Sequence, residues 1–260
     1  MTARDILSQP PPGFDLRLAY GVHPQNFCEI RLASDPKNVP LIIFFHGGFW
    51  RAAYDLSHAG HICEAFRRLG INTANVEYRR VGCGGGWPIA LDDIRTAYRY
   101  IVEHAAELDL KVDRLLVMGH SAGAHLAACL AAYETGVRNC VTLAGVLDLS
   151  RAWELHLSSD AVFEFIGGTP SEVPERYRAA SPIQLNIPHV RQLIVHGRQD
   201  DVVPWELSKS YCDTKRKLGE QVECVWLEGA GHFELVDPST PVFQQVAKAV
   251  LKVIDTESGR

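Results

Sequence analysis

Long hydrophobic runs are missing from this sequence. Apolar stretches such as residues 41–45 are far shorter than the roughly 20 residues that a helix needs to cross a bilayer. The first residues also lack the apolar segment of a secretory signal, because Met1 to Asp5 lead toward a run of prolines at 10–12. The two absences together exclude a membrane-spanning chain and predict a soluble protein, and the cysteine usage described below predicts a cytoplasmic one.

Blocks of charge of one sign are missing as well. The 26 Lys and Arg residues and the 31 Asp and Glu residues are interspersed, and they give a formal net charge of -5. Such a distribution offers neither a basic face for nucleic acid nor a polybasic anchor for an anionic membrane. We therefore expect a small-molecule partner, with no nucleic acid and no membrane.

Closely spaced cysteine pairs and metal-binding motifs are also absent from the sequence. The seven cysteines are odd in number, are scattered and include no C-x-x-C pair. This usage is typical of small buried apolar side chains in a reducing compartment rather than of a disulfide framework. His58 and His61 share one helix face, but no H-E-x-x-H motif or third ligand accompanies them. We expect no metal and no cofactor.

What is present is the alternation of strand-like and helix-like segments that is typical of an α/β fold with a mainly parallel sheet. Strands are predicted at residues 41–45, 71–78, 115–118, 140–144, 192–196 and 222–227, with an antiparallel edge strand at 28–32. Helices are predicted at residues 56–69, 89–104, 122–133, 206–218 and 242–254.

The chain length suits one domain. At 260 residues with 47% hydrophobic residues, the sequence predicts a single domain over residues 1–260 with one large core. A proline-rich leader of about residues 1–20 precedes the first predicted strand. The strand and helix alternation is interrupted at about residues 149–186, which we interpret as a cap-like insertion over the sheet.

The most informative motif is the pentapeptide G-H-S-A-G at residues 119–123, which follows a predicted strand directly. A serine between two glycines at a strand-to-helix turn predicts a nucleophile elbow, in which the glycines leave room for a strained serine backbone. The hydroxyl of Ser121 would then project freely as a nucleophile. The motif alone is weak evidence, because short patterns of common residues arise by chance.

An aspartate and a histidine that follow the elbow later in the chain complete a catalytic pattern. A serine nucleophile needs a histidine base and a carboxylate that orients it, and doubly wound hydrolases carry them in the order Ser, Asp, His. Asp200 follows a predicted strand, and His232 follows the last predicted strand in a glycine-rich segment. Asp201 is a direct rival of Asp200, and Glu206 is a more remote one.

A third segment predicts where the charge of a reacting carbonyl oxygen is stabilised. Residues 46–50 read H-G-G-F-W and follow the first predicted strand of the parallel sheet. Backbone N–H groups from this position and from the residue after the nucleophile form the oxyanion hole of such hydrolases. We predict Gly48, Phe49 and Ala122 as the donors.

These motifs resemble the α/β-hydrolase superfamily over nearly the whole chain from about Pro40 onward. The segment at 46–50 is similar to the H-G-G-G loop of hormone-sensitive-lipase-like carboxylesterases, and closer to the H-G-G-x-W loop of kynurenine formamidases. Phe49 stands in place of the third glycine, and Y-R-R-V at 78–81 replaces the usual Y-R-L-A-P-E. The resemblance implies an α/β-hydrolase fold, a doubly wound mainly parallel sheet with flanking helices and a small cap.

The resemblance also implies a serine hydrolase that works without a cofactor. We expect a carboxylesterase that cleaves small to medium carboxylic esters through an acyl-enzyme on Ser121. An arylformamidase that hydrolyses N-formylkynurenine is the alternative. A serine peptidase and a non-catalytic ligand-binding protein on the same fold fit less well. The sequence leaves the oligomeric state open and is compatible with a homodimer.

Overall fold

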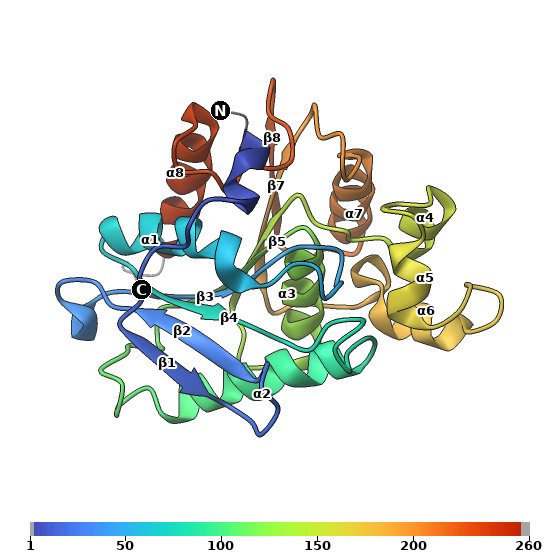
Figure 1. Cartoon of the computed structure of the whole chain (residues 1–260). Helices are drawn as coiled ribbons and strands as arrows, with labels where there is room; N and C mark the ends of the chain where they lie inside the picture. The colour runs from blue at the N-terminus through green and yellow to red at the C-terminus, as the bar shows by residue number, and fades with distance from the viewer. Residues whose placement is uncertain (1–2, 256–260) are drawn as a thin grey trace.

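A computed structural model describes residues 3–255 and shows one eight-stranded sheet between two layers of helices (Figure 1). The strands follow the spatial order β1-β2-β4-β3-β5-β6-β7-β8. Their bounds are Leu16–Ala19 for β1, Phe27–Arg31 for β2, Leu41–Phe45 for β3, Asn72–Val76 for β4, Leu115–His120 for β5, Asn139–Leu143 for β6, Arg191–Gly197 for β7 and Val222–Leu227 for β8. The predicted α/β-hydrolase fold, with its mainly parallel sheet, is confirmed.

The antiparallel part of the sheet lies at one edge. Strands β3 to β8 pair in parallel, whereas β2 pairs antiparallel with both β4 and β1. The antiparallel strand expected at residues 28–32 therefore exists, but its placement at the sheet edge is wrong, because β1 lies outside it. Most side chains of β1 are exposed, and its sequence contains no apolar run that would have indicated a strand. The strand lies within the predicted leader.

Two helical layers cover the sheet. Helices α1 (Gly60–Arg68) and α8 (Pro241–Asp255) lie on one face, and α2 (Ile89–Glu103), α3 (Ala122–Tyr133) and α7 (Glu206–Lys217) lie on the other (Figure 1). Side chains of β3 alternate between the two apolar clusters, with Ile43 in one and Ile42 in the other. Burial on both faces explains why the central strands read as continuous apolar runs.

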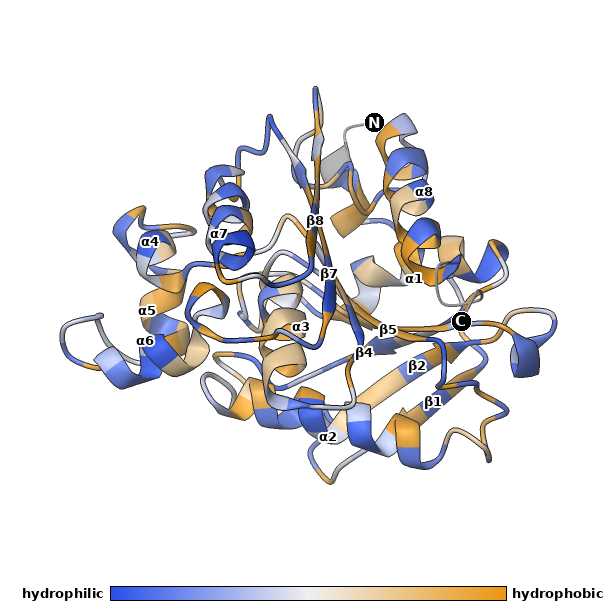
Figure 2. Ribbon diagram, turned by 180° about the vertical axis from the view of Figure 1, so that it is seen from behind, coloured by the Kyte–Doolittle hydropathy of each residue, from blue (hydrophilic) through white to orange (hydrophobic). Residues whose placement is uncertain are grey.

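Helix α3 is enclosed by the other elements. Nearly all of its residues are buried, and it is among the most uniformly apolar helices in the molecule (Figure 2). A helix that is apolar on all sides is expected to be buried. Short 3-10 helices at Ala3–Leu7, Pro36–Asn38 and Leu56–Ala59 complete the part before β4.

The interruption predicted at about residues 149–186 is a helical insertion between β6 and β7. It contains α4 (Leu149–Glu154), α5 (Ala161–Ile166), α6 (Pro174–Ala180) and the 3-10 helix Pro182–Gln184. These helices lie together beside α3 and α7, at one side of the molecule (Figure 1).

The cysteine prediction is wrong for one pair. Cys212 on α7 and Cys224 on β8 form a disulfide with 6.9 Å between their Cα atoms. Helix α7 packs against β8, so residues that show no motif in sequence become neighbours in space. The unpaired cysteines are Cys28, Cys63, Cys83, Cys129 and Cys140, and all but Cys83 are buried as predicted. None of the helices described between residues 3 and 255 is long and apolar enough to cross a membrane.

Candidate active site

Ser121 lies at the turn between β5 and α3. Its backbone has φ 56° and ψ -120°, a conformation that is rare for residues with a side chain. A Cβ at Gly119 would lie 2.3 Å from the carbonyl carbon of Gly123, and a Cβ at Gly123 would lie 2.0 Å from the carbonyl oxygen of Phe45. The turn therefore needs both glycines, as the elbow motif predicts.

Asp200 and His232 meet at the carboxyl ends of β7 and β8. Nδ1 of His232 lies 2.7 Å from Oδ2 of Asp200, and both side chains are almost fully buried. The rival Asp201 is exposed, and Glu206 is exposed on α7. Of the carboxylates considered in the sequence, Asp200 is the one that contacts His232.

The carboxylate of Asp200 is stabilised as an anion. Burial alone would raise its pKa, but hydrogen bonds from His196 and His232 hold the pKa well below the usual range. The other carboxylate oxygen, Oδ1, accepts the backbone N–H groups of Val202 and Val203 at 2.8 Å each. Asp200 is thus held ionised and in one orientation.

Ser121 and His232 line the same cavity. Its volume is about 300 Å³, and it is bordered by Leu7, Gly48, Phe49, Tyr54, His58, His120, Ser121, Ser158, Val202, His232 and Phe233. No Lys, Arg, Asp or Glu belongs to this described lining. Leu7 comes from the predicted leader, so that segment contributes to the cavity.

The loop at residues 46–50, here called the 46–50 loop, borders the cavity next to Ser121. Gly48 has φ 110° and Phe49 has φ 48°. Among residues 3–255, no partner accepts a hydrogen bond from the backbone N–H groups of Gly48, Phe49 or Ala122. A Cβ on Gly47 would lie 3.0 Å from Cβ of Ser121, so the loop approaches the serine closely. The predicted donors are therefore unpaired and close to the elbow.

A buried contact between a histidine and a glutamate, which the sequence did not reveal, supports the 46–50 loop. Nε2 of His46 lies 3.0 Å from Oε1 of Glu77, and the Tyr78 hydroxyl donates to the carbonyl oxygen of His46 at 2.9 Å. Burial would raise the pKa of Glu77, but His46 and Arg80 hold it below its usual value. The signal available in the sequence was a single carboxylate directly after β4, a strand that is buried throughout.

Trp50 does not face the cavity. It is fully buried and stacks on Phe165 of α5, with 4.4 Å between the ring centroids. The tryptophan that carries the H-G-G-x-W resemblance therefore joins the 46–50 loop to the insertion.

His120 is a further cavity residue that the sequence analysis did not select. Its Nε2 lies 3.1 Å from the carbonyl oxygen of His232, and the two ring centroids are 4.4 Å apart. Burial, followed by the proximity of His232, holds the pKa of His120 well below its usual value. A neutral His120 can donate from Nε2 to that carbonyl and so fix the loop that carries His232. Within the described residues, no cluster of three or more His, Cys, Asp or Glu side chains could hold a metal ion.

The chain is similar to several curated esterases. The chain is 26% identical over 265 residues to a probable isoprenylcysteine alpha-carbonyl methylesterase ICMEL1 of Arabidopsis thaliana, covering 91% of this chain and 55% of that protein. It is 27% identical over 249 residues to esterase LipC of Mycobacterium tuberculosis, covering 85% of this chain and 60% of that protein. The chain thus spans somewhat more than half the length of these curated relatives.

Solved structures share the fold. A truncated carbohydrate esterase from gut microbiota superposes with a TM-score of 0.83 at 20% identity, covering 97% of this chain and all of that one. Est2, an esterase of Thermogutta terrifontis, gives a TM-score of 0.75 at 24% identity, covering 96% of this chain and 95% of that one. The BD-FAE family model matches residues 29–214. Because this match spans well over half of the sequence, the chain belongs to the BD-FAE family of α/β hydrolases.

Proposed function

We propose that this protein is a serine esterase that hydrolyses small to medium, uncharged carboxylic esters. Ser121 is the nucleophile, His232 is the general base, and Asp200 orients the imidazole. The observation that carries the proposal is the 2.7 Å contact between Asp200 and His232 beside a cavity that Ser121 also lines. Because Nδ1 of His232 faces the carboxylate, Nε2 is left for the serine hydroxyl. The esterases among its relatives support the same activity.

The mechanism follows from these positions. Oγ of Ser121 attacks the ester carbonyl carbon while His232 takes its proton, and the N–H groups of Gly48, Phe49 and Ala122 stabilise the oxyanion. The carbon–oxygen bond to the alcohol then breaks, and His232 gives the alcohol its proton. Water, activated by the same histidine, attacks the acyl-enzyme and releases the acid together with the free serine. The chemistry requires no cofactor.

The cavity favours an uncharged ester over a formamide of an amino acid. Among the residues that the structure describes, its lining contains no Lys, Arg, Asp or Glu that could pair with the ammonium and carboxylate groups of N-formylkynurenine. Trp50, the residue that pointed to formamidases, is buried away from the cavity. A volume of about 300 Å³ lies at the small end of ligand pockets and suits a short acyl or aryl group.

The cellular location is a separate matter. The cytoplasmic location that the sequence predicts stays a prediction. The disulfide between Cys212 and Cys224 is of a kind that persists mainly in oxidising compartments.

A labelling experiment tests the catalytic assignment. The protein is treated with an organophosphonate, and the modified peptide is identified by mass spectrometry. We expect one adduct at Ser121, none in Ser121→Ala, and folding of that variant equal to the wild type. Absence of an adduct, together with absence of ester hydrolysis, would favour the ligand-binding alternative.

A substrate comparison tests the ester preference. Values of kcat/KM are measured for a series of aryl esters from acetate upward and for N-formylkynurenine. We expect the short esters to be the best substrates. A preference of several decades for the formamide would overturn the proposal.

A further inference from the structure

A second histidine contacts the carboxylate that orients His232. His196, at the end of β7, has its Nε2 3.1 Å from Oδ2 of Asp200, the same oxygen that receives His232. The side chains of His196 and Asp200 are both fully buried. With the two backbone N–H groups on Oδ1, four donors surround the carboxylate. Two imidazoles and two peptide groups therefore hold this anion.

The hydrogen bonds of His196 fix which ring nitrogen carries the proton. Nε2 faces two oxygens that only accept, Oδ2 of Asp200 and the carbonyl oxygen of Val203 at 2.9 Å. Nε2 must therefore bear a hydrogen. Nδ1 lies 2.7 Å from the hydroxyl of Ser208, a fully buried residue of α7, which donates to it when the ring is neutral. Each ring nitrogen thus has a defined partner.

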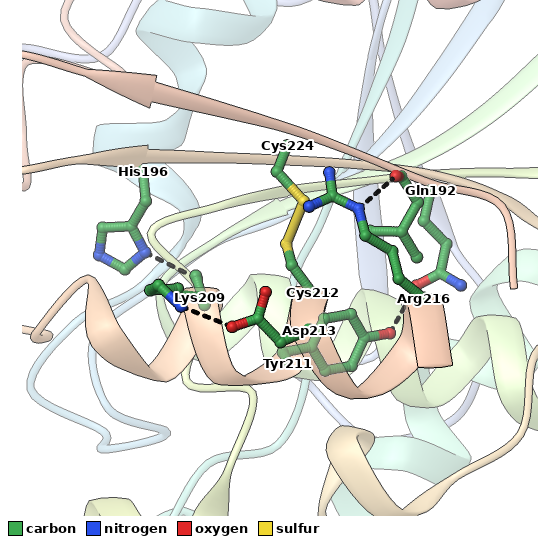
Figure 3. The surroundings of a disulfide bond; sticks show 10 residues. Gln192, His196, Lys209, Tyr211, Cys212, Asp213, Arg216 and Cys224 are labelled. Atoms are coloured by element: carbon green, nitrogen blue, oxygen red, sulfur yellow. Dashed lines mark hydrogen bonds and ion pairs between the residues drawn. A yellow bond between two sulfur atoms is a disulfide. The ribbon is translucent and has the colours of Figure 1, made fainter. Parts of the chain in front are cut away.

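The elements around His196 hold it firmly. The ring connects the end of β7, the loop that carries Asp200 and the first turn of α7. The disulfide between Cys212 and Cys224 ties the next turn of α7 to β8, on the same side of the helix as His196 in Figure 3. A rigid donor on a strand end and a tethered helix is suited to orienting a catalytic group.

We propose that His196 is a positioning residue for the reaction, which donates from Nε2 to Oδ2 of Asp200 and thereby sets the orientation and basicity of the carboxylate that faces His232. This role rests on the proposed esterase function. Without the donor, the three remaining donors would orient the carboxylate less firmly, and Oδ2, held by His232 alone, would concentrate its charge on His232. Catalysis would slow, although the cavity that binds the ester would keep its lining.

Two amide variants separate this role from packing. The side-chain amide of Gln reaches the position of Nε2, whereas that of Asn reaches only the position of Nδ1. We expect His196→Asn to lower kcat by about 10- to 100-fold, less than the roughly 10⁴-fold that loss of the oriented tautomer costs in serine hydrolases. His196→Gln is expected to recover kcat to within about threefold of wild type by restoring the donor. KM for a short neutral ester is expected to stay within about twofold in both variants.

The pH profile of kcat/KM supplies a second measurement. Among the described residues, the ionisable side chains near His232 are Asp200, His196 through that carboxylate, His120 of β5, and His58 and Tyr54, which line the same cavity. Loss of the donor in His196→Asn leaves more negative charge on the oxygen of Asp200 that faces His232. This charge stabilises the protonated form of His232. The acid limb should therefore move to higher pH in His196→Asn and return in His196→Gln.

A third variant covers the case in which both substitutions prevent folding. Ser208→Ala removes only a hydroxyl, keeps α7 intact, and leaves Nδ1 of His196 without its hydrogen bond, so that the ring is held less firmly. We expect it to lower kcat by about three- to tenfold. Wild-type kcat and pH profile in all three variants, or equal losses in the Asn and Gln variants without a profile shift, would overturn the role of His196. Absence of ester hydrolysis and of Ser121 labelling in the wild type would instead overturn the proposed function.

Discussion

Arg51 and Glu164 form an ion pair, with 2.8 Å between Nε and Oε2, that joins the end of the 46–50 loop to helix α5. The same guanidinium donates to the Ser158 hydroxyl at 3.3 Å and to the carbonyl oxygen of Ser159 at 2.9 Å. Ser158 borders the cavity, and the backbone has positive φ at both serines. One side chain thus fastens a strained part of the insertion over the cavity beside Ser121.

We predict that Arg51→Ala raises KM for short esters several-fold and changes kcat by less than about threefold. The reason is that the Ser158 segment loses its attachment, while the groups that contact the reacting carbonyl stay in place. Steady-state kinetics on one ester measure both constants. Arg151→Ala, which breaks an exposed pair with Glu154 on the neighbouring helix α4, is the matched control and should leave KM unchanged. Equal KM values in both variants would show that the attachment does not shape the cavity.

Asp200→Asn should lower kcat by about 10⁴-fold, because an amide no longer favours the tautomer and charge that His232 needs. The fold should be retained, which circular dichroism can verify. Asp201→Asn makes the same substitution at the exposed neighbouring residue and should keep wild-type activity. If the two variants exchanged these behaviours, the orienting carboxylate would be Asp201.

The disulfide should stabilise the protein measurably. Cys212 and Cys224 are separated by 12 positions, and closing a loop of this size contributes roughly 3 kcal/mol to the free energy of unfolding. The double variant Cys212→Ala/Cys224→Ala should therefore unfold at a lower urea concentration, and the reduced wild type should behave like it. Cys83→Ala, at an unpaired and half-buried position, is the control. Seven alkylated cysteines in the unreduced, denatured protein, instead of five, would show that the bond does not form.

Acid should weaken the fold through buried histidines. Burial lowers the pKa of His58 to about 3 and that of His125 to about 4, and it holds the pKa of His120 well below its usual value. In the unfolded chain these side chains take up a proton near pH 6.5. Stability is therefore complete above that pH and falls as pH decreases below it. The slope approaches about 1.4 kcal/mol per pH unit for each histidine.

Urea titrations between pH 6.5 and 5 measure this slope above the range in which most carboxylates titrate. His125→Gln should reduce the slope by one proton, because His125 lies in the core away from the cavity. His189→Gln removes an exposed histidine and should leave the slope unchanged. An unaltered slope in His125→Gln would mean that this ring is protonated in the folded protein.

The central sheet was predictable from sequence because its strands are buried on both faces. The apolar runs at β3, β5 and β7 are visible in the sequence and predict these strands. The glycines on either side of Ser121 predict its strained backbone. Strand β1 has no such signal, because its side chains are largely exposed and only its pairing with β2 makes it a strand. Local patterns therefore identify the core better than the edge.

Long-range polar contacts were not predictable. His46 and Glu77, like His196 and Ser208, come from different elements of the fold, and the residues around each contain no sign of its partner. The disulfide has the same character, since it depends on how α7 packs against β8. The sequence predicts the residues that we propose for the chemistry, and the tertiary structure adds the residues that hold them in position.

The position of strand β8 at the edge of the sheet makes the whole site sensitive to local opening. It is the outermost parallel strand, bonded in the sheet to β7 on one side, and the segment with His232 follows it directly. Edge elements open by local fluctuation more readily than central ones, as amide hydrogen exchange records. His232 would then be withdrawn from Ser121 while the remaining sheet is intact. Loss of activity on warming should therefore precede global unfolding, and slower exchange at β8 should prolong the working lifetime of the protein.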